Sequence, residues 1–274
     1  MQFQQTSLRA PFIAEGVGMH TGAEARITVK PAPANSGIHF VVGAARIPAR
    51  AAFVVNTRRC TCLGNGDKRV DTVEHLLSAL FGLCITNAEI EVEGPEVPIL
   101  DGSAQVWVKG LKDAGIEDLG VCAPALRLSE PVALQTGDSW YIAVPSEELF
   151  VTCVTHFDHP LLGTETITYM ETPDHYEQEI APARTFGFSS EVEALLAAGL
   201  ARGGSLDNAL IIQHDRFSHK LRLPHECARH KLMDLLGDLS LTGERLCASV
   251  TAIKPSHQGN TAFATLLSNY ASDN

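Results

Sequence analysis

Two segments far apart in the chain share one order of predicted elements, and this repeat constrains the fold more than any other feature. The stretch "EHLLSALFGLCITNAEIEVEG" predicts a helix, a glycine turn and a strand. The stretch "RHKLMDLLGDLSLTGERLCASVTAI" predicts the same three elements in the same order. When the two are aligned, His75 matches His230 and Gly82 matches Gly237. We therefore expect two halves of related plan, with the two histidines in equivalent places at the junction between the halves.

The remaining pattern places further strands and helices around these two units. Segments that are β-branched or alternate in polarity, bounded by Gly, Pro or Asn, predict strands at residues 25–32, 37–42, 87–94, 124–134, 139–145, 149–157, 165–171, 208–213 and 247–254. Helical periodicity predicts helices at residues 72–82, 103–114, 190–199, 226–240 and 260–270. Helices and strands mix without strict alternation, which favours an α+β fold over a doubly wound parallel sheet. The segment "GIEDLGVCAPALRL" predicts a boundary between domains 1–122 and 123–274.

Charge and hydropathy exclude several classes of protein. The net charge of −11 argues against nucleic-acid binding, which depends on Lys and Arg against phosphates. No apolar run approaches the roughly 18 residues of a membrane span, and the N-terminal segment has no secretory signal pattern. The seven cysteines form no CxxC pair, so a thiolate metal site is not expected even at Cys60 and Cys62. Thiols without an export signal indicate a cytoplasmic protein.

The second of the two repeated helices carries a polar stripe. His230, Asp234 and Asp238 are spaced at i, i+4 and i+8, so they share one face, whereas leucines occupy the opposite face. An imidazole and a carboxylate one turn apart can bind the same metal ion. The simpler alternative is a solvated helix face with a His–Asp pair.

The first repeated helix places Glu74 and His75 outside its apolar stripe. A glutamate beside a ligating histidine is typical of hydrolytic zinc sites, where the carboxylate accepts a proton from the attacking water. The helix contains neither HExxH nor HxxEH, because position 71 is aspartate. The alternative is structural: Asp71 and Glu74 have the spacing of a capping box at a helix start.

A third candidate lies in "KPSHQGNTAF", where His257 precedes a helix that Asn260 is placed to cap. In that loop His257 is accessible enough to act as an acid or a ligand, although it also fits an ordinary surface histidine. Together, His75, His230 and Asp234 would supply three ligands to Zn²⁺ and leave one position open, as catalytic sites do. Glu74, His257 and Lys231 are the nearest candidates for a base, an acid and an oxyanion donor.

Eight motifs occur in the order seen in the UDP-3-O-acyl-N-acetylglucosamine deacetylases, and the chain resembles that family from about Gly16 to His257. The motifs are "GVGMHTG", "TRRCTCL", "TVEHLLSAL", "EGPEVPILDGSA", "ARTFGF", "GGSLDNAL", "RHKLMDLLGDL" and "KPSH". The resemblance implies a zinc-dependent hydrolase that removes acetate from a UDP-linked acylated glucosamine in lipid A biosynthesis. It also implies two similar β-α-α-β domains (ribosomal protein S5 domain 2-like), packed helix layer to helix layer, with the active site at their interface.

The resemblance further implies a role for individual residues. The implied metal ligands are His75, His230 and Asp234. The implied catalytic residues are Glu74 as general base, His257 as general acid, Asp238 as the partner that orients His257, Thr185 as a hydroxyl donor to the oxyanion, and Lys231 facing the substrate.

The segment from Phe186 to Asn208 resembles an insert that shapes an apolar passage for the acyl chain. Its candidate lining residues are Phe186, Phe188, Leu195, Leu196 and Leu200, although helix core is an equally good account of each. The stretch "SWYIAVPSEELF" has no Lys or Arg where family members often place one, and Arg59 occupies a usually apolar position. Arg59 is therefore a candidate replacement cation near the nucleotide.

Two other functions fit parts of the pattern. A zinc peptidase-like hydrolase would use Asp71 and His75 as an i, i+4 ligand pair, and a metal-free binding module would use its histidines structurally. The resemblance favours the deacetylase, with a small-molecule UDP-sugar as partner, transient proximity to a membrane surface through the acyl chain, and a monomeric state. His20, in "GMHTG", has no predicted role.

Overall fold

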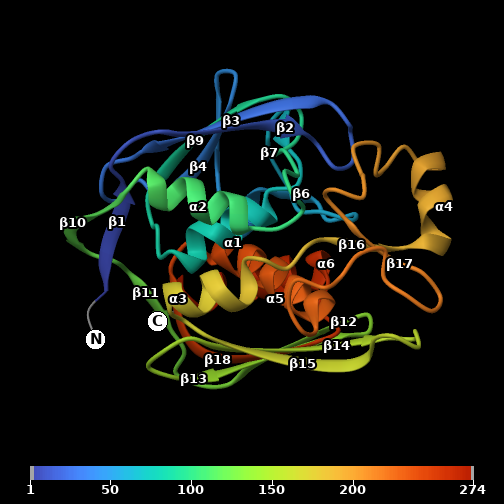
Figure 1. The fold of residues 1–274 in the computed structure, drawn as a ribbon. Coiled ribbons are helices and arrows are strands. Elements are labelled where there is room, and N and C mark those ends of the chain that lie inside the picture. The colour runs from blue at the N-terminus through green and yellow to red at the C-terminus, as the bar shows by residue number, and fades with distance from the viewer. Residues whose placement is uncertain (1–2, 273–274) are drawn as a thin grey trace.

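The structure is a computed structural model that describes residues 3–272, and it places helices between two β-sheets (Figure 1). The first sheet has the order β2-β3-β9-β4-β5, in which β4 and β9 are parallel and the other neighbours antiparallel. Its strands are β2 (Phe12–Val17), β3 (Glu24–Pro31), β4 (Ile38–Val42), β5 (Ala45–Pro48) and β9 (Ala88–Glu93).

The second sheet has the order β12-β13-β18-β14-β15, and β11 (Ala125–Arg127) pairs with β18 beyond this path. Strands β14 and β18 are parallel, and the other neighbours on the path are antiparallel. Its strands are β12 (Val132–Thr136), β13 (Ser139–Pro145), β14 (Phe150–Phe157), β15 (Gly163–Met170) and β18 (Arg245–Ile253). Both sheets therefore have the same strand order, with one parallel pair at the same place.

The helices follow the same repeated plan. Helix α1 (Glu74–Gly82) precedes β9, and α5 (Glu226–Leu239) precedes β18. Helix α2 (Gln105–Asp113) follows β9, and α6 (His257–Ser272) follows β18. The predicted match of His75 to His230 thus falls on topologically equivalent helices.

Shorter elements complete the described chain. Strands β1 (Gln4–Leu8) and β10 (Ile116–Cys122) pair with each other, and β6 (Val54–Asn56), β7 (Cys62–Asn65) and β8 (Lys68–Val70) form a small sheet. Helix α3 (Pro173–His175) continues into a π-helical turn at Tyr176–Ile180. A segment at one end of the molecule contains β16 (Phe186–Phe188), α4 (Val192–Ala197) and β17 (Leu210–Ile212) (Figure 1). Short 3-10 turns lie at Ala51–Phe53, Ser189–Glu191 and Ser240–Thr242.

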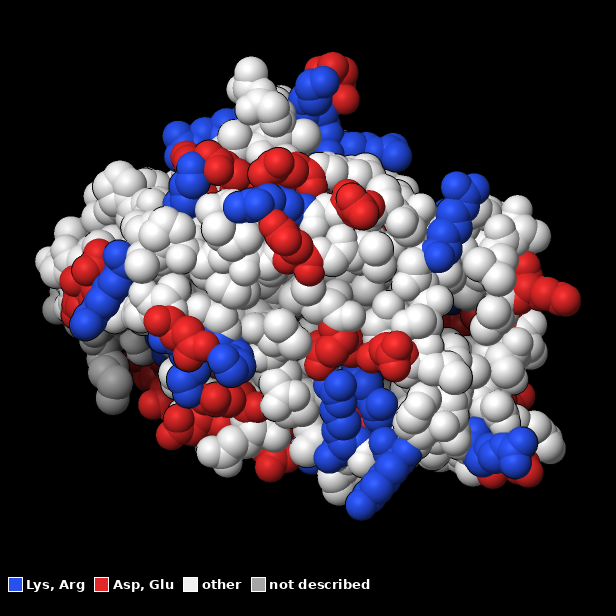
Figure 2. Space-filling view, turned by 45° about the horizontal axis from the view of Figure 1, so that its top comes forward, with Lys and Arg blue, Asp and Glu red and all other residues white. Residues whose placement is uncertain are grey.

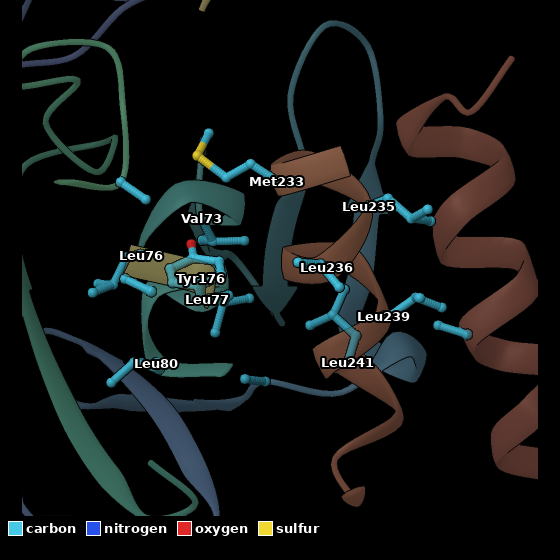
Figure 3. Close-up of a cluster of buried hydrophobic side chains, with 14 of the residues drawn as sticks. Val73, Leu76, Leu77, Leu80, Tyr176, Met233, Leu235, Leu236, Leu239 and Leu241 are labelled. Atoms are coloured by element: carbon cyan, nitrogen blue, oxygen red, sulfur yellow. The ribbon is translucent and has the colours of Figure 1, made fainter. Parts of the chain in front are cut away.

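Helices α1 and α5 pack directly against each other between the sheets. Figure 3 shows the apolar cluster they share, in which Leu77 and Leu236 are fully buried. The backbones come very close at Gly237, because a Cβ there would lie 2.2 Å from the carbonyl oxygen of Glu74. A larger residue would force the helices apart, since interiors tolerate little overpacking. Gly237 therefore lets the start of α1 lie directly against α5.

The ends and faces of these helices differ in detail from the sequence predictions and from the structural alternatives to them. Helix α1 begins at Glu74, and the expected capping box is absent because Glu74 Oε2 accepts a hydrogen bond from Thr61 N (3.0 Å). Helix α6 begins at His257, so this histidine lies in the first turn rather than in a loop and Asn260 does not cap the helix. The amide of Asn260 instead donates to Asp238 (2.9 Å). Both α1 and α5 are buried on nearly all sides, which hides the polar stripes from solvent.

Charged side chains of both signs intermingle on the face shown in Figure 2. On the first sheet, Arg26 contacts Glu15 at 2.7 Å and Arg46 contacts Glu89 at 3.5 Å, so cations there are paired with carboxylates. Within residues 3–272, no helix has the length and apolar content needed to cross a bilayer.

Candidate active site

Three side chains predicted as metal ligands meet between α1 and α5. Nε2 of His75 lies 3.6 Å, and Nε2 of His230 lies 3.4 Å, from Oδ1 of Asp234. Their ligand atoms all lie within 4.8 Å of one another, and each residue is at most 5% exposed. The two imidazoles meet edge to face with ring centroids 5.0 Å apart. The three residues thus form one compact group built from both repeated helices.

The chemistry of this group fits a divalent cation. Oδ1 of Asp234 is buried and has no hydrogen-bond partner among the described residues, although a buried carboxylate oxygen left unpaired is costly. Nδ1 of His230 donates to the carbonyl of Ala183 (3.2 Å), which leaves Nε2 as a lone-pair donor. Burial lowers the pKa of His230 to about 4, so its imidazole is neutral near pH 7. Two imidazoles and one carboxylate are a ligand set typical of a catalytic zinc site.

The other oxygen of Asp234 is bound to Lys231, whose Nζ lies 2.7 Å from Oδ2. Burial lowers the pKa of Lys231, but the Asp234 carboxylate raises it, and the net pKa is raised. Burial raises the pKa of Asp234, but His230 and Lys231 bring it well below its usual range. Asp234 is therefore ionised, and Lys231 remains a cation at the edge of the group.

Glu74 lies directly beside the three-residue group. Its Oε1 is 3.8 Å from Nε2 of His257, and its Oε2 accepts the Thr61 backbone hydrogen bond described above. Burial raises the pKa of Glu74, against the opposing effect of His257 and His75. A carboxylate whose pKa is raised toward neutrality is a better proton acceptor than an ordinary glutamate.

His257 is oriented by Asp238. Its Nδ1 lies 2.9 Å from Oδ2 of Asp238, which also accepts from Asn260. The remaining ring nitrogen, Nε2, faces Glu74 and lies 3.9 Å from Oδ2 of Asp234. Burial lowers the pKa of His257, but Asp238 and the other carboxylates raise it to about 9. The imidazole is therefore protonated near pH 7, as a general acid must be.

Residues that the sequence reasoning missed hold these groups in place. The hydroxyl of Thr61 donates to Oδ1 of Asp238 and also lies 3.2 Å from Nδ1 of His257. The hydroxyl of Tyr141 donates to Oδ1 of Asn260 (2.8 Å), which fixes the amide that binds Asp238. Thr61 lies within the quoted "TRRCTCL", but nothing local to that motif indicates a partner 177 residues away.

A cavity of about 1120 Å³ opens onto the group and is lined by most of the predicted site residues. Glu74, His75, His230, Lys231, Asp234 and His257 lie in its wall, together with Thr185, Phe186, Phe188, Leu195, Leu196 and Arg59. Leu200 is not among the lining residues, whereas the adjacent Ala201 is. Asp238 lies behind the wall, where it is fully buried.

Arg59, the candidate cation near the nucleotide, contacts a carboxylate of the protein itself. Its Nη2 lies 3.1 Å from Oε2 of Glu191, just before α4, and both side chains are largely exposed. Arg59 therefore links the "TRRCTCL" loop to the insert across the cavity mouth.

Two other histidine interpretations are resolved by the geometry. Asp71 precedes α1 and is not part of the three-residue group near His75 in residues 3–272, which argues against the helical i, i+4 ligand pair of the peptidase hypothesis. His20 lines the cavity, and its Nδ1 accepts from the backbone N of Ala201 (3.4 Å). This contact joins the "GVGMHTG" turn to the part of the insert that follows α4.

Comparison with known proteins connects this geometry to one family. Residues 5–269 match the family described as UDP-3-O-acyl N-acetylglycosamine deacetylase. A protein named UDP-3-O-acyl-N-acetylglucosamine deacetylase from Geotalea uraniireducens is 39% identical over 97% of this chain and 89% of its own length. Proteins of the same name from Anaeromyxobacter sp. and Nostoc sp. are 42% and 41% identical, over 90% and 93% of this chain and 83% and 94% of their own lengths. The chain therefore belongs to the UDP-3-O-acyl-N-acetylglucosamine deacetylase family.

Proposed function

We propose that this protein removes the N-acetyl group from UDP-3-O-acyl-N-acetylglucosamine, giving acetate and UDP-3-O-acyl-glucosamine in lipid A biosynthesis. One observation carries the proposal: His75, His230 and Asp234 converge beside Glu74 and His257 in the wall of a large cavity. In this proposal the cofactor is Zn²⁺, and the enzyme acts as a cytoplasmic monomer that meets the membrane surface only through its substrate's acyl chain.

The proposal includes a division of the chain into two domains, 1–122 and 123–274, each of the ribosomal protein S5 domain 2-like β-α-α-β plan. The shared strand order of the two sheets supports this division, as does the contact between α1 and α5. The domains would pack helix layer to helix layer, and the active site would lie at their interface. Each domain would then supply part of the metal centre.

The metal would be held by Nε2 of His75, Nε2 of His230 and the unpaired carboxylate oxygen of Asp234. A zinc ion bound there supplies a Lewis acid that polarises the acetyl carbonyl and lowers the pKa of a nearby water molecule. Glu74 accepts the proton of the water that attacks the carbonyl carbon. The Thr185 hydroxyl donates to the developing oxyanion, with the Lys231 ammonium close by.

His257 completes the reaction by protonating the nitrogen of the leaving amine. Without that proton the amine would leave as an anion, which is a very poor leaving group. Asp238 keeps Nδ1 of His257 hydrogen-bonded, so that Nε2 presents its proton to the cavity. Each acid or base role is typically worth about 10²–10⁴ in rate.

The cavity suits the proposed substrate. Its lining combines the cationic and acidic groups of the catalytic end with apolar side chains from β16 and α4. Phe186, Phe188 and Leu195 would contact the acyl chain, and Arg59 would lie near the charged end of the substrate or hold the insert in place. The volume of about 1120 Å³ slightly exceeds the roughly 300–1,000 Å³ of ordinary ligand pockets.

An acetate-release assay on the UDP-sugar, with and without a chelator, tests the function. We expect acetate in proportion to zinc content, loss of the activity with chelator, and its return when zinc is added back. Metal analysis after exhaustive dialysis accompanies the assay. A metal-free protein whose thermal stability does not change with zinc would favour a binding module and refute the enzyme.

The contact between Asp238 and His257 predicts a change in pH dependence. In Asp238→Asn the carboxylate that raises the pKa of His257 is lost, so the pKa falls and the acid deprotonates at lower pH. The alkaline limb of the kcat profile should move to lower pH by about one unit or more, because opposite charges shift pKa values by that amount. Asp67→Asn, at an 86% exposed carboxylate, is the matched control. An unmoved alkaline limb in Asp238→Asn would show that His257 is not the acid.

A further inference from the structure

A buried ion pair joins the start of α5 to the segment that carries Thr185. Arg184 and Glu226 have side chains that are 8% and 0% exposed. Nε of Arg184 donates to Oε1 of Glu226 (2.7 Å), and Nη2 donates to Oε2 (3.1 Å). The backbone N–H groups of Arg184 and Arg222 donate to the same carboxylate at 3.1 and 2.7 Å. Four hydrogen-bond donors thus saturate the carboxylate of Glu226. Burial raises the pKa of Glu226, but these hydrogen bonds and the charge of Arg184 bring the pKa below its usual value.

Both neighbours of Arg184 in the chain have a place in the active site. The carbonyl of Ala183 accepts the Nδ1 hydrogen bond of His230 and so sets the orientation of that imidazole. Thr185 lines the cavity, and its backbone is held by hydrogen bonds to Gly102 (2.7 Å) and Leu210 (2.9 Å). A movement of Arg184 would therefore displace both the proposed oxyanion donor and the carbonyl that orients a metal ligand.

Glu226 also continues the polar stripe of α5 by one turn. Glu226, His230, Asp234 and Asp238 follow one another at four-residue intervals, and all four are buried. Asp238 holds His257 at one end of this stripe, and Glu226 holds the 183–185 segment at the other. One helix thus orders side chains that reach the site from two other parts of the chain.

We propose that Arg184 and Glu226 are positioning residues that set the geometry of Thr185 and His230 for deacetylation. The proposal rests on the functions proposed above for these two residues. A buried ion pair is weak evidence for stability, because apolar residues of the same volume often stabilise a protein as well or better. The hydrogen bonds within such a pair do fix geometry, because a bidentate Arg–carboxylate pair constrains both the position and the angle of the two side chains.

The test compares Arg184→Gln and Glu226→Gln with a control on the same helix. We expect kcat to fall about 10–100-fold with KM changed less than about 3-fold, because a shift of about 1 Å in a reacting group has an effect of that size. With zinc supplied at saturating concentration, zinc content per chain should remain near that of the unsubstituted protein. The control is Arg229→Gln, which removes a partly exposed pair with Glu179 (2.7 Å) and should leave kcat unchanged.

A double-mutant cycle separates positioning from general destabilisation. If Arg184 acts through Thr185, Arg184→Gln should lower kcat by less than about 3-fold when Thr185 is already alanine. Full additivity, or wild-type kcat in both single variants, would overturn the proposal. If Arg184→Gln fails to fold, Arg184→Lys replaces it in the test, because lysine keeps the charge without the bidentate geometry. We expect Arg184→Lys to lower kcat about 10-fold, and a wild-type kcat in this variant would overturn the proposal. If the unsubstituted protein releases no acetate, the proposed function itself fails, which is a different result.

Discussion

Asp234→Ala will weaken zinc binding by more than about 100-fold and remove nearly all acetate release, since even loss of an outer contact to a metal ligand costs about 10–100-fold. The substitution deletes the one carboxylate oxygen of the group that has no hydrogen-bond partner in residues 3–272. It also leaves the Lys231 ammonium without its carboxylate, next to two imidazoles that would otherwise bind a cation. Zinc measured after dialysis, together with acetate released per chain, checks the prediction.

Asp71→Ala is the matched control for this change. Asp71 is four residues before His75 in the sequence, yet it lies outside the three-residue group. We expect Asp71→Ala to keep its zinc. Zinc loss in Asp71→Ala but not in Asp234→Ala would restore the peptidase-like ligand pair and contradict the centre described here.

Glu74→Ala will separate catalysis from metal binding. We expect kcat to fall by about 10²–10⁴-fold, the usual contribution of a general base, while zinc content stays at the unsubstituted level. The reason is geometric: Glu74 reaches toward His257 and the Thr61 backbone, and it does not belong to the ligand group. Glu91→Ala, on the outer face of the first sheet, removes a carboxylate that is 42% exposed and should leave kcat unchanged. Near-normal turnover in Glu74→Ala would exclude this residue as the base.

Much of the metal group was predictable because its signals are local. The stripe of His230, Asp234 and Asp238 follows from helical spacing alone, and α5 has the predicted bounds to within one residue. The predicted helices at 103–114 and 190–199 correspond to α2 and α4, and the α+β class is confirmed. The pairing of α1 with α5 was expected from the internal repeat and from the family resemblance, and His75 and His230 do come together.

The features that the sequence did not predict depend on contacts between residues that are distant in the chain. Asn260 is a residue type that often caps a helix, and the local sequence predicted that role. Its side chain instead binds the carboxylate of Asp238, and the helix starts earlier, at His257. Glu74 has the spacing of a capping box, but its carboxylate is used by Thr61. Strands β6, β7 and β8 contain three or four residues each, too few to show an alternating pattern. In each case tertiary partners outweigh the local preference.

The division of the reacting groups among α1, α5 and α6 has a consequence during synthesis on the ribosome. A growing chain that ends before residue 230 has only His75 of the three candidate metal ligands, and one that ends before residue 257 has all three but lacks the proposed acid, His257. Under the proposed mechanism the first product lacks two of the three metal ligands, and the second lacks an acid that is typically worth about 10²–10⁴ in rate. Most of the activity should therefore appear only after α6 has been made, because His257, the proposed acid, is the last of these groups to be synthesised.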